Sequence, residues 1–505
     1  MTKTRGLFWL ILFILLISLP MLFGWIMQGT QLRFSGLLLN PTDGYSYFAK
    51  MQQGAQGAWL FKLPFTAQPG TGVVLFEFYL FLGQFSRLFH LSIPAVFYLA
   101  RIFCSIFLFL QIWAFIKKYL IFKNLSTEQV LLFILFGSGM GWAALIGGYK
   151  SADFWIAEAY PFFSALISPH FTLGLAILLW VLNHVFEQQS WFRRLELFLL
   201  AIVLCLAMPF ASVILCIILS LAWLMIPLWR NRMVLTQILI LAIPSMLFLG
   251  WQYGATLYHP QLSIWNQQNV TLSPPLWDIL IGFSPMLILV ILSLRKGKEY
   301  WQQAGYRLLF IWFLSCLLLS IFPFSLQRRF LFSFSIPVTS LGLYELDQWM
   351  AKSWGARLKN VIFALPLVTI SMLYMIMAFS ILQRSHYAYM TLAEVEAYSW
   401  IQNTAAKDTV ILSDDLHALK IPALTGHQVF YGHPFETVNA MEKKSQLEAL
   451  LSCQEFTTQS AMEFLQEEQV NEVLIPKEIY EKAICLQELP VIRQNQEFIY
   501  LHVQD

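Results

Sequence analysis

The chain has 505 residues, of which 58% are hydrophobic and only 12% are charged, and its net charge is +3. Soluble domains carry about 25% charged residues, so this composition excludes an ordinary soluble enzyme. Apolar runs of about 20 residues recur from Gly6 to Ser380. They predict a polytopic α-helical membrane protein.

The charge is distributed unevenly along the chain. From Arg384 onward there are 18 acidic and 8 basic residues, a net charge of −10, so the part before it has a net charge of +13. Basic residues of membrane proteins gather in cytoplasmic loops, and we interpret the excess in this way and not as a nucleic-acid-binding surface. We expect a transmembrane domain over 1–383 and a soluble extracytoplasmic domain over 384–505.

The first apolar run, 7–27, follows Lys3 and Arg5 and lacks a small-residue cleavage site. We therefore expect an uncleaved anchor with a cytoplasmic N-terminus, which makes 28–71 the first extracytoplasmic loop. Segment 72–92 carries several ionisable residues and is expected to lie along or re-enter the outer face. The pattern predicts about eleven spans, or twelve if 72–92 crosses. The other expected spans are 95–116, 128–147, 168–186, 195–208, 210–229, 233–251, 275–294, 304–323, 330–348 and 360–382.

The tail has the pattern of a small α/β domain. Expected strands are 409–413, 428–431, 472–475 and 498–502, and expected helices are 392–402, 441–451 and 460–469. There is no Gly-rich phosphate loop, so we do not predict a nucleotide-binding domain. Cys453 and Cys485 can form a disulfide if the tail lies outside the cytosol, and the sequence leaves this open.

The stretch from Asn40 to Gly54 contains Asp43, the first acidic residue of the chain. A carboxylate just outside a membrane can deprotonate an acceptor hydroxyl or amine, or hold a metal ion. Pro-Thr-Asp-Gly is also good turn chemistry. The local sequence therefore leaves a catalytic and a purely structural role for Asp43 open.

Further polar residues lie in segments that the topology places outside. Asp153 and Glu158 can bind a metal ion or sugar hydroxyls, or belong to a solvated loop. His170 follows Pro169 at the start of a span, where it can bind phosphate, act as acid or base, or simply lie at the interface. Ionisable groups at a membrane boundary are candidate functional residues by default.

Gln327, Arg328 and Arg329 form the most specific of these groups. Two arginines on the outer side depart from the charge rule for loops, and guanidinium groups suit phosphate because of their planar fork of donors. The alternative role is an anchor for lipid headgroups.

Two more groups have the composition of sugar sites. Trp265, Asn266 and Gln267 offer stacking and amide donors, although this is also ordinary composition for an interfacial loop. In the tail, His433 stands in a Gly-His-Pro sequence and is a candidate substrate-binding residue.

Together these residues resemble the GT-C class of membrane glycosyltransferases, which includes protein O-mannosyltransferases, aminoarabinose transferases and oligosaccharyltransferases. Asp43 matches the acidic residue of the first outer loop, Asp153 and Glu158 match a later acidic element, and the soluble tail matches the domain after the last span. The chain is also similar to uncharacterised bacterial membrane proteins near that class. The residues shared with them are Gly137–Trp142, Asp153, Glu158, Pro169–Phe171, Gln327–Arg329 and Gly432–Pro434.

The resemblance is incomplete in the first loop. There is no adjacent Asp-Glu pair there and no evident Trp-Trp-Asp acceptor motif. This argues against an oligosaccharyltransferase. It also leaves metal dependence open: Mg²⁺ or Mn²⁺ is the candidate cofactor, with Asp43, Asp153 and Glu158 as candidate ligands.

The resemblance implies a sugar transferase of a bacterial inner membrane. The donor would be a polyprenyl-phosphate-linked sugar, and the acceptor an extracytoplasmic lipid, glycan or protein. Asp43 would act as base with inversion at the anomeric carbon, and Arg328, with Arg329 or His170, would neutralise the leaving phosphate.

A transporter or flippase of a lipid-linked or anionic substrate is the alternative function, since it explains the spans equally well. It predicts ionisable residues near the midplane of spans and weak twofold repetition. A protein whose tail recruits assembly partners is a third class. We favour the enzyme because the ionisable residues gather mainly at one outer face.

Overall fold

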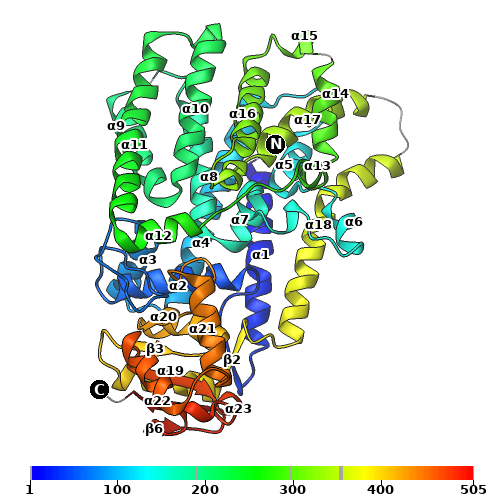
Figure 1. The fold of residues 1–505 in the computed structure, drawn as a ribbon. Helices are drawn as coiled ribbons and strands as arrows, with labels where there is room; N and C mark the ends of the chain where they lie inside the picture. The colour runs from blue at the N-terminus through cyan, green and yellow to red at the C-terminus, as the bar shows by residue number, and fades with distance from the viewer. Residues whose placement is uncertain (1–2, 189, 296, 352–355, 504–505) are drawn as a thin grey trace. The chain divides into compact units, whose positions relative to one another are not determined.

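The computed structural model describes residues 3–188, 190–295, 297–351 and 356–503, and it is mostly helical (Figure 1). It divides into two compact units. The helical unit comprises 1–20, 98–251 and 271–378, and the mixed unit comprises 21–97, 252–270 and 379–505. The mixed unit therefore joins the predicted first outer loop to the tail, while the predicted domain boundary at 383 stays a prediction.

The helical unit contains most of the apolar segments. Helix α10 packs against α9 and α16, and α14 packs against α17. The helices that lie wholly or mostly in this unit are α1 (Lys3–Ile26), α4 (Ile93–Tyr119), α5 (Thr127–Phe136), α6 (Gly141–Ile146), α7 (Pro161–Ile167), α8 (Pro169–His184), α9 (Trp191–Ala207), α10 (Pro209–Met225), α11 (Arg232–Tyr258), α13 (Leu276–Phe283), α14 (Met286–Leu294), α15 (Gly297–Tyr300), α16 (Ala304–Ile321), α17 (Ser335–Met350) and α18 (Ala356–Leu382).

Among the described residues, five helices are long and apolar enough to cross a membrane, namely α1, α4, α11, α16 and α18. Helices α13 and α14 make a sixth if they are one span, bent by 99°. The protein is therefore an integral membrane protein. The other predicted spans are shorter helices, with α8 and α17 at 16 residues and α9 and α10 at 17, so the count of about eleven spans stays a prediction.

A glycine motif fits against the bend between α13 and α14. A Cβ atom on Gly139 would lie 1.9 Å from the carbonyl oxygen of Gly282, so only glycine permits this approach. The next residue, Met140, donates its backbone N–H to the Ile281 oxygen at 2.9 Å. Part of the Gly-Ser-Gly-Met-Gly sequence thus serves backbone packing.

Helices α2 (Pro41–Ala55) and α3 (Glu77–Phe89) pack closely in the mixed unit. A Cβ on Gly54 would lie 2.1 Å from the Leu80 oxygen, and one on Gly83 would lie 2.0 Å from the Met51 oxygen. With 13 residues, α3 is only about 20 Å long, against about 30 Å for a hydrocarbon core. This length agrees with the prediction that 72–92 does not cross.

The tail carries a five-stranded mixed sheet with strand order β4-β3-β5-β7-β6. The strands are β3 (Val410–Leu412), β4 (Gln428–Val429), β5 (Glu472–Pro476), β6 (Val491–Gln494) and β7 (Phe498–His502). Strand β3 is parallel to β4 and β5, and β7 is antiparallel to β5 and β6. The four predicted strands are confirmed. Strand β6 was not predicted. All four of its residues are exposed, so it lacks the alternation of buried apolar and exposed polar residues that marks a half-buried strand.

Helices α19 (Leu392–Thr404), α21 (Ala440–Ser452) and α22 (Thr458–Glu467) confirm the three predicted ones, whereas α20 (Asp415–Thr425) and the short α23 (Lys477–Tyr480) were not predicted. Buried apolar side chains from the sheet and these helices form one core, which includes Leu412, Leu447 and Leu501. A two-stranded sheet pairs β1 (Leu32–Phe34) with β2 (Tyr389–Thr391). It joins the start of the first loop to the start of the tail.

Cys453 and Cys485 form a disulfide, with Cα atoms 5.8 Å apart and a sequence separation of 32. Both cysteines contact the core of the tail. The question that the sequence left open is thus answered in favour of pairing. Disulfides persist in oxidising compartments, so the bond agrees with a tail outside the cytosol.

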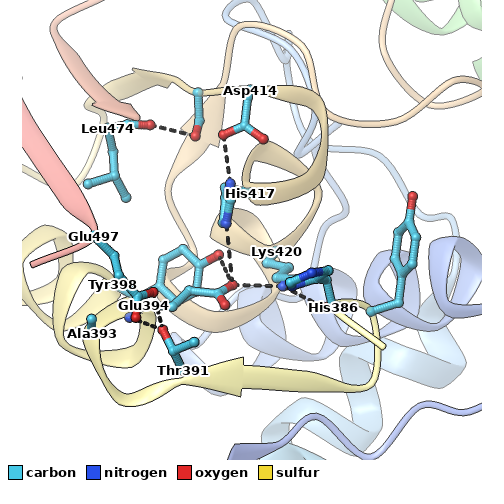
Figure 2. Close-up of polar contacts among 12 residues, drawn as sticks. His386, Thr391, Ala393, Glu394, Tyr398, Asp414, His417, Lys420, Leu474 and Glu497 are labelled. Carbon is cyan, nitrogen blue, oxygen red and sulfur yellow. Dashed lines mark hydrogen bonds and ion pairs between the residues drawn. The ribbon is translucent and has the colours of Figure 1, made fainter. Parts of the chain in front are cut away.

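A buried polar network joins α19 to α20 (Figure 2). The Lys420 ammonium group, fully buried, donates to the Glu394 carboxylate at 2.7 Å, and the Tyr398 hydroxyl donates to the same oxygen at 2.8 Å. His417 lies between Glu394 and Asp414, at 3.9 and 2.6 Å. Burial, followed by the charge of Glu394, raises the pKa of Tyr398, so its hydroxyl remains a donor. This network stabilises the tail.

Candidate functional site: two polar clusters

Asp43 lies in the first turn of α2. Pro41 occupies the first helical position, where its fixed φ suits a helix start, and the free N–H groups of a helix N-terminus favour a carboxylate. The Asn40 side-chain amide donates to Asp43 Oδ2 at 2.5 Å. Pro-Thr-Asp-Gly thus begins a helix and does not form a reverse turn, and Asp43 stays partly exposed.

Asp43, Ser46 and Lys50 share one face of α2, because residues three, four and seven apart are neighbours on a helix. Lys50 Nζ donates to Ser46 Oγ at 2.5 Å and to Glu436 Oε1 at 2.7 Å. Ser46 Oγ also donates to Glu436 Oε1, at 2.5 Å. Glu436 comes from the loop between β4 and α21, so this face of α2 contacts the tail directly.

Three aromatic rings surround the Lys50 ammonium group. Its Nζ lies 4.4 Å from the ring centre of Phe76, 5.7 Å from that of Phe61 and 5.9 Å from that of Tyr47. Only 1% of the Lys50 side chain is exposed. Ring faces attract cations, so this cage and Glu436 together replace the water that the ammonium group loses on burial.

His433 is fixed in the same loop as Glu436. Its Nδ1 accepts the backbone N–H groups of Phe435 and Glu436, each at 3.1 Å, and its ring packs on Phe65. Burial lowers the pKa of His433, and the nearby charges of Glu436 and Asp43 oppose this only in part. The ring is therefore neutral, and because Nδ1 accepts, the proton lies on Nε2.

Glu436 stays ionised in this loop. Burial raises its pKa, but the charge of Lys50 and the hydrogen bonds from Lys50 and Ser46 lower it, so that the net shift is downward. Asp43, Ser46, Lys50, His433 and Glu436 together are the Asp43 cluster. It lies entirely within the mixed unit.

Helix α12 (Pro260–Gln268) carries the other predicted residues of this unit. The Trp265 ring meets Phe76 edge to face, with ring centres 6.2 Å apart, and thus packs behind the cage of Lys50. Asn266 is half-buried, and Gln267 is exposed and donates only to Ser263, at 3.5 Å.

The neighbouring Gln268, which was not predicted, connects α12 to the tail. Its side-chain oxygen accepts the Asn439 N–H at 3.0 Å, and its amide nitrogen donates to the Thr437 carbonyl. Because Thr437 directly follows Glu436, this contact supports the loop of the Asp43 cluster.

The arginine cluster lies in the helical unit and consists of Glu158, Arg328 and Arg329. Arg329 Nη1 lies 3.4 Å and Arg328 Nε 3.9 Å from Glu158 Oε1, and the Arg328 guanidinium lies 5.1 Å from the Trp155 ring centre. The Glu158 side chain is 6% exposed, whereas those of the arginines are 25% and 28% exposed. Two partly exposed guanidinium groups thus meet one buried carboxylate, an arrangement that suits an anion.

Backbone contacts fix the position of this cluster. The arginines lie on the 3₁₀ turn Gln327–Leu331, where the Arg328 N–H donates to the Thr271 oxygen at 3.1 Å. The Gln327 side-chain oxygen accepts the Ser273 N–H at 3.2 Å. Gln327 therefore holds the turn in place, and it is Arg328 and Arg329 that contact Glu158.

Asp153 is not part of the arginine cluster. It is buried, and its carboxylate accepts from Ser151 Oγ at 2.5 Å, the Gly141 N–H at 3.2 Å and Thr369 Oγ1 at 3.3 Å. Burial raises its pKa to about 6, although these hydrogen bonds act in the opposite direction. Because its oxygens are occupied, Asp153 holds its loop against Gly141. Glu158 is the acidic residue that meets the arginines.

His170 lies at the start of α8, in the same unit as the arginine cluster. Its Nδ1 lies 2.5 Å from Ser168 Oγ, and its ring contacts Phe171. The side chain is partly exposed, so it remains accessible to a ligand.

Asp153 and Glu158, two of the three candidate metal ligands, have other partners within the helical unit. In the part of the chain that the structure describes, no group of three or more His, Cys, Asp or Glu side chains could hold a metal ion. Glu158 faces two guanidinium groups and Asp153 is saturated by neutral donors. Mg²⁺ and Mn²⁺ need several free oxygen ligands, so this donor set does not fit them.

Comparison with known proteins gives no match to a family model and none to a curated protein sequence. Solved structures do match. The archaeal oligosaccharyltransferase AglB from Archaeoglobus fulgidus, in complex with an inhibitory peptide and a dolichol-phosphate, aligns with 99% of this chain and 74% of its own. The TM-score is 0.53 at 12% identity.

The arabinofuranosyltransferase AftD from Mycobacteria aligns with 98% of this chain, at a TM-score of 0.54 and 13% identity. This chain spans 40% of the AftD chain. Both proteins are GT-C glycosyltransferases. The chain has the GT-C fold. The predicted fold class is thereby confirmed, and at 12% identity the likeness to the oligosaccharyltransferase is one of fold alone.

Sequence reasoning missed Ser46, Lys50 and Glu436 as members of a site. A usable signal was present: Pro41 followed by Asp43 marks a helix start, and a helix over this stretch puts Ser46 and Lys50 on the face of Asp43. Nothing local connects that face to Glu436, which lies 386 residues beyond Lys50.

Proposed function

We propose that the protein is a membrane glycosyltransferase that moves a sugar from a polyprenyl-phosphate donor to an extracytoplasmic acceptor. The GT-C fold supports this kind of reaction. The observation that carries the proposal is the arginine cluster, because its two partly exposed guanidinium groups suit the phosphate of such a donor. AglB was solved with a dolichol-phosphate, a lipid phosphate of this chemical class.

In the proposed reaction Asp43 acts as general base. It removes the proton from an acceptor hydroxyl or amine, whose lone pair then forms the bond to the anomeric carbon. The bond between that carbon and the phosphate oxygen breaks, the polyprenyl phosphate leaves with the electron pair, and the anomeric configuration inverts. The Asp43 side chain is partly exposed, so an acceptor can reach its carboxylate.

Arg328 and Arg329 are proposed to stabilise the negative charge that develops on the leaving phosphate. Preorganised charge of this kind is often the largest catalytic contribution. Glu158 holds the two guanidinium groups before the donor binds. His170 is proposed to assist at the phosphate, and Trp265, Asn266 and Gln267 to contact the sugar or the acceptor.

The protein is proposed to lie in a bacterial inner membrane with its N-terminus in the cytoplasm and its tail outside. The disulfide between Cys453 and Cys485 supports an extracytoplasmic tail, since such bonds persist in oxidising compartments. The tail would then select the acceptor. Asp153 and Glu158, two of the candidate metal ligands, have other partners. The proposed reaction therefore has no metal-dependent step.

The test is Asp43→Asn in the purified full-length protein, supplied with polyprenyl-phosphate sugars and assayed for release of the sugar. Loss of the base should lower the rate by about 10²–10⁴-fold, the usual contribution of general base catalysis. Asp408→Asn, at an exposed position of the tail, is the matched control and should keep the wild-type rate. Normal activity in Asp43→Asn, with the fold intact, would exclude the base assignment.

A liposome flux assay separates this proposal from a flippase. Wild-type protein should release sugar from the donor without moving intact donor across the bilayer. Movement of intact donor without sugar release would replace the glycosyltransferase by the flippase.

A further inference from the structure

Two polar atoms of the Asp43 cluster have no hydrogen-bond partner among the described residues. They are Nε2 of His433 and Oε2 of Glu436, both of which are buried. Leaving such a group without a partner is unfavourable, and most of all for a charged one. These two atoms therefore mark a place where a ligand or an ordered water is expected to bind.

The chemistry of the two atoms is complementary. His433 is neutral, and since its Nδ1 accepts two backbone N–H groups, its Nε2 carries the proton and donates. The Glu436 carboxylate is ionised, and because Oε1 is occupied by Lys50 and Ser46, Oε2 remains to accept. The turn from His433 to Glu436 thus offers one hydrogen-bond donor, His433 Nε2, and one acceptor, Glu436 Oε2.

A hydroxyl group fits this pair better than other common groups. It accepts one hydrogen bond and donates another, whereas a phosphate offers only acceptors and an ammonium group only donors. Sugars and polyols consist largely of such groups. The pair therefore favours a hydroxylated ligand.

The surrounding contacts connect this pair to Asp43. Asp43, Ser46 and Lys50 share one face of α2, and Glu436 bonds to the last two of them. The charge of Asp43 acts on the His433 ring, which is thus within its electrostatic range. The turn and the carboxylate belong to one polar cluster in one compact unit.

We infer that His433 and Glu436 bind a hydroxyl group of the acceptor substrate next to Asp43. The inference rests on the proposed function and makes it more specific, because it assigns the acceptor to the polyhydroxylated class, such as a glycan or a glycolipid. His433 and Glu436 bind without making or breaking a covalent bond, and the transferred proton still goes to Asp43. Lys50 and Ser46 act indirectly, by holding Oε1 of Glu436 so that Oε2 faces the ligand's hydroxyl.

The chain permits a matched pair of variants at His433. In His433→Asn the amide oxygen takes the place of Nδ1, so it can still accept the turn N–H groups, but the Nε2 donor is lost. In His433→Gln the amide nitrogen takes the place of Nε2, so a donor remains while the Nδ1 acceptor is lost. If His433 has only a structural role, His433→Asn should be the milder of the two changes. If His433 binds the acceptor, His433→Gln should reduce sugar transfer less than His433→Asn.

The assay compares two fates of the donor sugar, namely transfer to n-octyl glucoside as the probe acceptor and hydrolysis by water. His433→Asn should lower the ratio of transfer to hydrolysis about tenfold, the effect of one lost hydrogen bond, and leave thermal stability near wild type. His433→Gln should retain most of the ratio despite lower stability. Glu436→Gln should lower the ratio, and Glu442→Gln, exposed in the same unit, should leave it unchanged.

An unchanged ratio in His433→Asn, together with an inactive Asp43→Asn, would overturn the inference and keep the proposed function. A wild-type protein that releases no sugar would overturn the proposed function itself. A second measurement is independent of turnover: a cryo-EM map with the probe bound should show a hydroxyl in contact with both atoms. A water held only by protein groups at that place, with the probe elsewhere, would also overturn the inference.

Discussion

At the scale of single residues, the two polar clusters use charge differently. In the Asp43 cluster the ammonium group of Lys50 and the carboxylate of Glu436 balance each other, and both are nearly excluded from water. In the arginine cluster two partly exposed cations share one buried carboxylate. The first arrangement joins α2 to the tail, while the second leaves two guanidinium groups partly exposed.

Lys50→Met is predicted to destabilise the protein by about 3–5 kcal/mol at neutral pH, because it leaves the Glu436 carboxylate buried without a counter-ion. In the wild type the pKa of Glu436 is lowered, so the pair adds stability above the ordinary carboxyl pKa, and this contribution is lost as the pH falls through the lowered value. In the variant the contributions of Lys50 are gone, and burial, the largest cause, raises that pKa against the remaining hydrogen bond from Ser46, so the deficit should shrink as the pH falls.

Thermal unfolding in detergent across a pH series measures this effect. Lys482→Met removes an exposed lysine of the same unit and is the control, with little change expected. A deficit that stays constant down to acidic pH would contradict the role assigned to the ion pair.

Arg328→Lys and Arg329→Lys are predicted to keep the fold but to weaken the donor interaction, because an ammonium group cannot reproduce the planar fork of donors. We expect kcat/KM for the polyprenyl-phosphate sugar to fall about 10–100-fold, the loss of one or two charge-assisted hydrogen bonds. Steady-state kinetics on the purified variants measure this loss. Arg493→Lys, exposed on β6, is the matched control, and equal losses at all three positions would contradict a specific phosphate site.

At the scale of elements, the segment between α1 and α4 owes its shape to the packing of α2 on α3. This contact brings backbone against backbone at Gly54 and Gly83. It fixes the axis of α2, and hence the direction of the face that carries Asp43, Ser46 and Lys50. The position of the candidate base thus depends on two glycines that lie outside the site.

Gly83→Ala is predicted to destabilise the protein by about 1–3 kcal/mol, because its Cβ would lie 2.0 Å from the Met51 oxygen and push the helices apart. Activity should fall with it, since the face of α2 moves. Gly250→Ala is the matched control in α11, where a Cβ meets nothing within 4 Å and alanine favours the helix. Thermal unfolding measures both variants, and equal stability would show that α2 and α3 do not require this close approach.

At the scale of the whole molecule, the mixed unit collects segments from three parts of the chain. The segments 21–97, 252–270 and 379–505 form one compact body. The β1–β2 sheet, the bonds of Gln268 and the Lys50–Glu436 pair hold these segments together. A substitution in the tail can therefore affect the helix that carries Asp43.

The disulfide of the tail gives a prediction at this scale. Replacing both cysteines, Cys453→Ser with Cys485→Ser, should lower stability by about 3–4 kcal/mol, from the chain entropy of a closed loop of this length. Thermal unfolding measures the loss. Protein purified with its thiols blocked should resist alkylation at both positions until it is reduced, and free thiols there would contradict an extracytoplasmic tail.

The sequence by itself determined the class of protein and most of its elements. Apolar runs identify membrane helices because burial in lipid demands them locally, and the strands of the tail have their own local pattern. Asp43 and the Gln327–Arg329 sequence could be singled out because charge at a membrane boundary is costly. Strand β6 is an exception. All of its residues are exposed, so the alternation of apolar and polar residues that predicts a strand is absent there.

Only the tertiary structure decided which charges meet. Glu158 and not Asp153 pairs with the arginines, because Asp153 is occupied by Ser151, Gly141 and Thr369. Lys50 meets Glu436 across 386 residues, a pairing that no local pattern encodes. Local propensity acts over a few residues, whereas ion pairs and hydrogen bonds depend on where distant segments come together, and that is settled by packing.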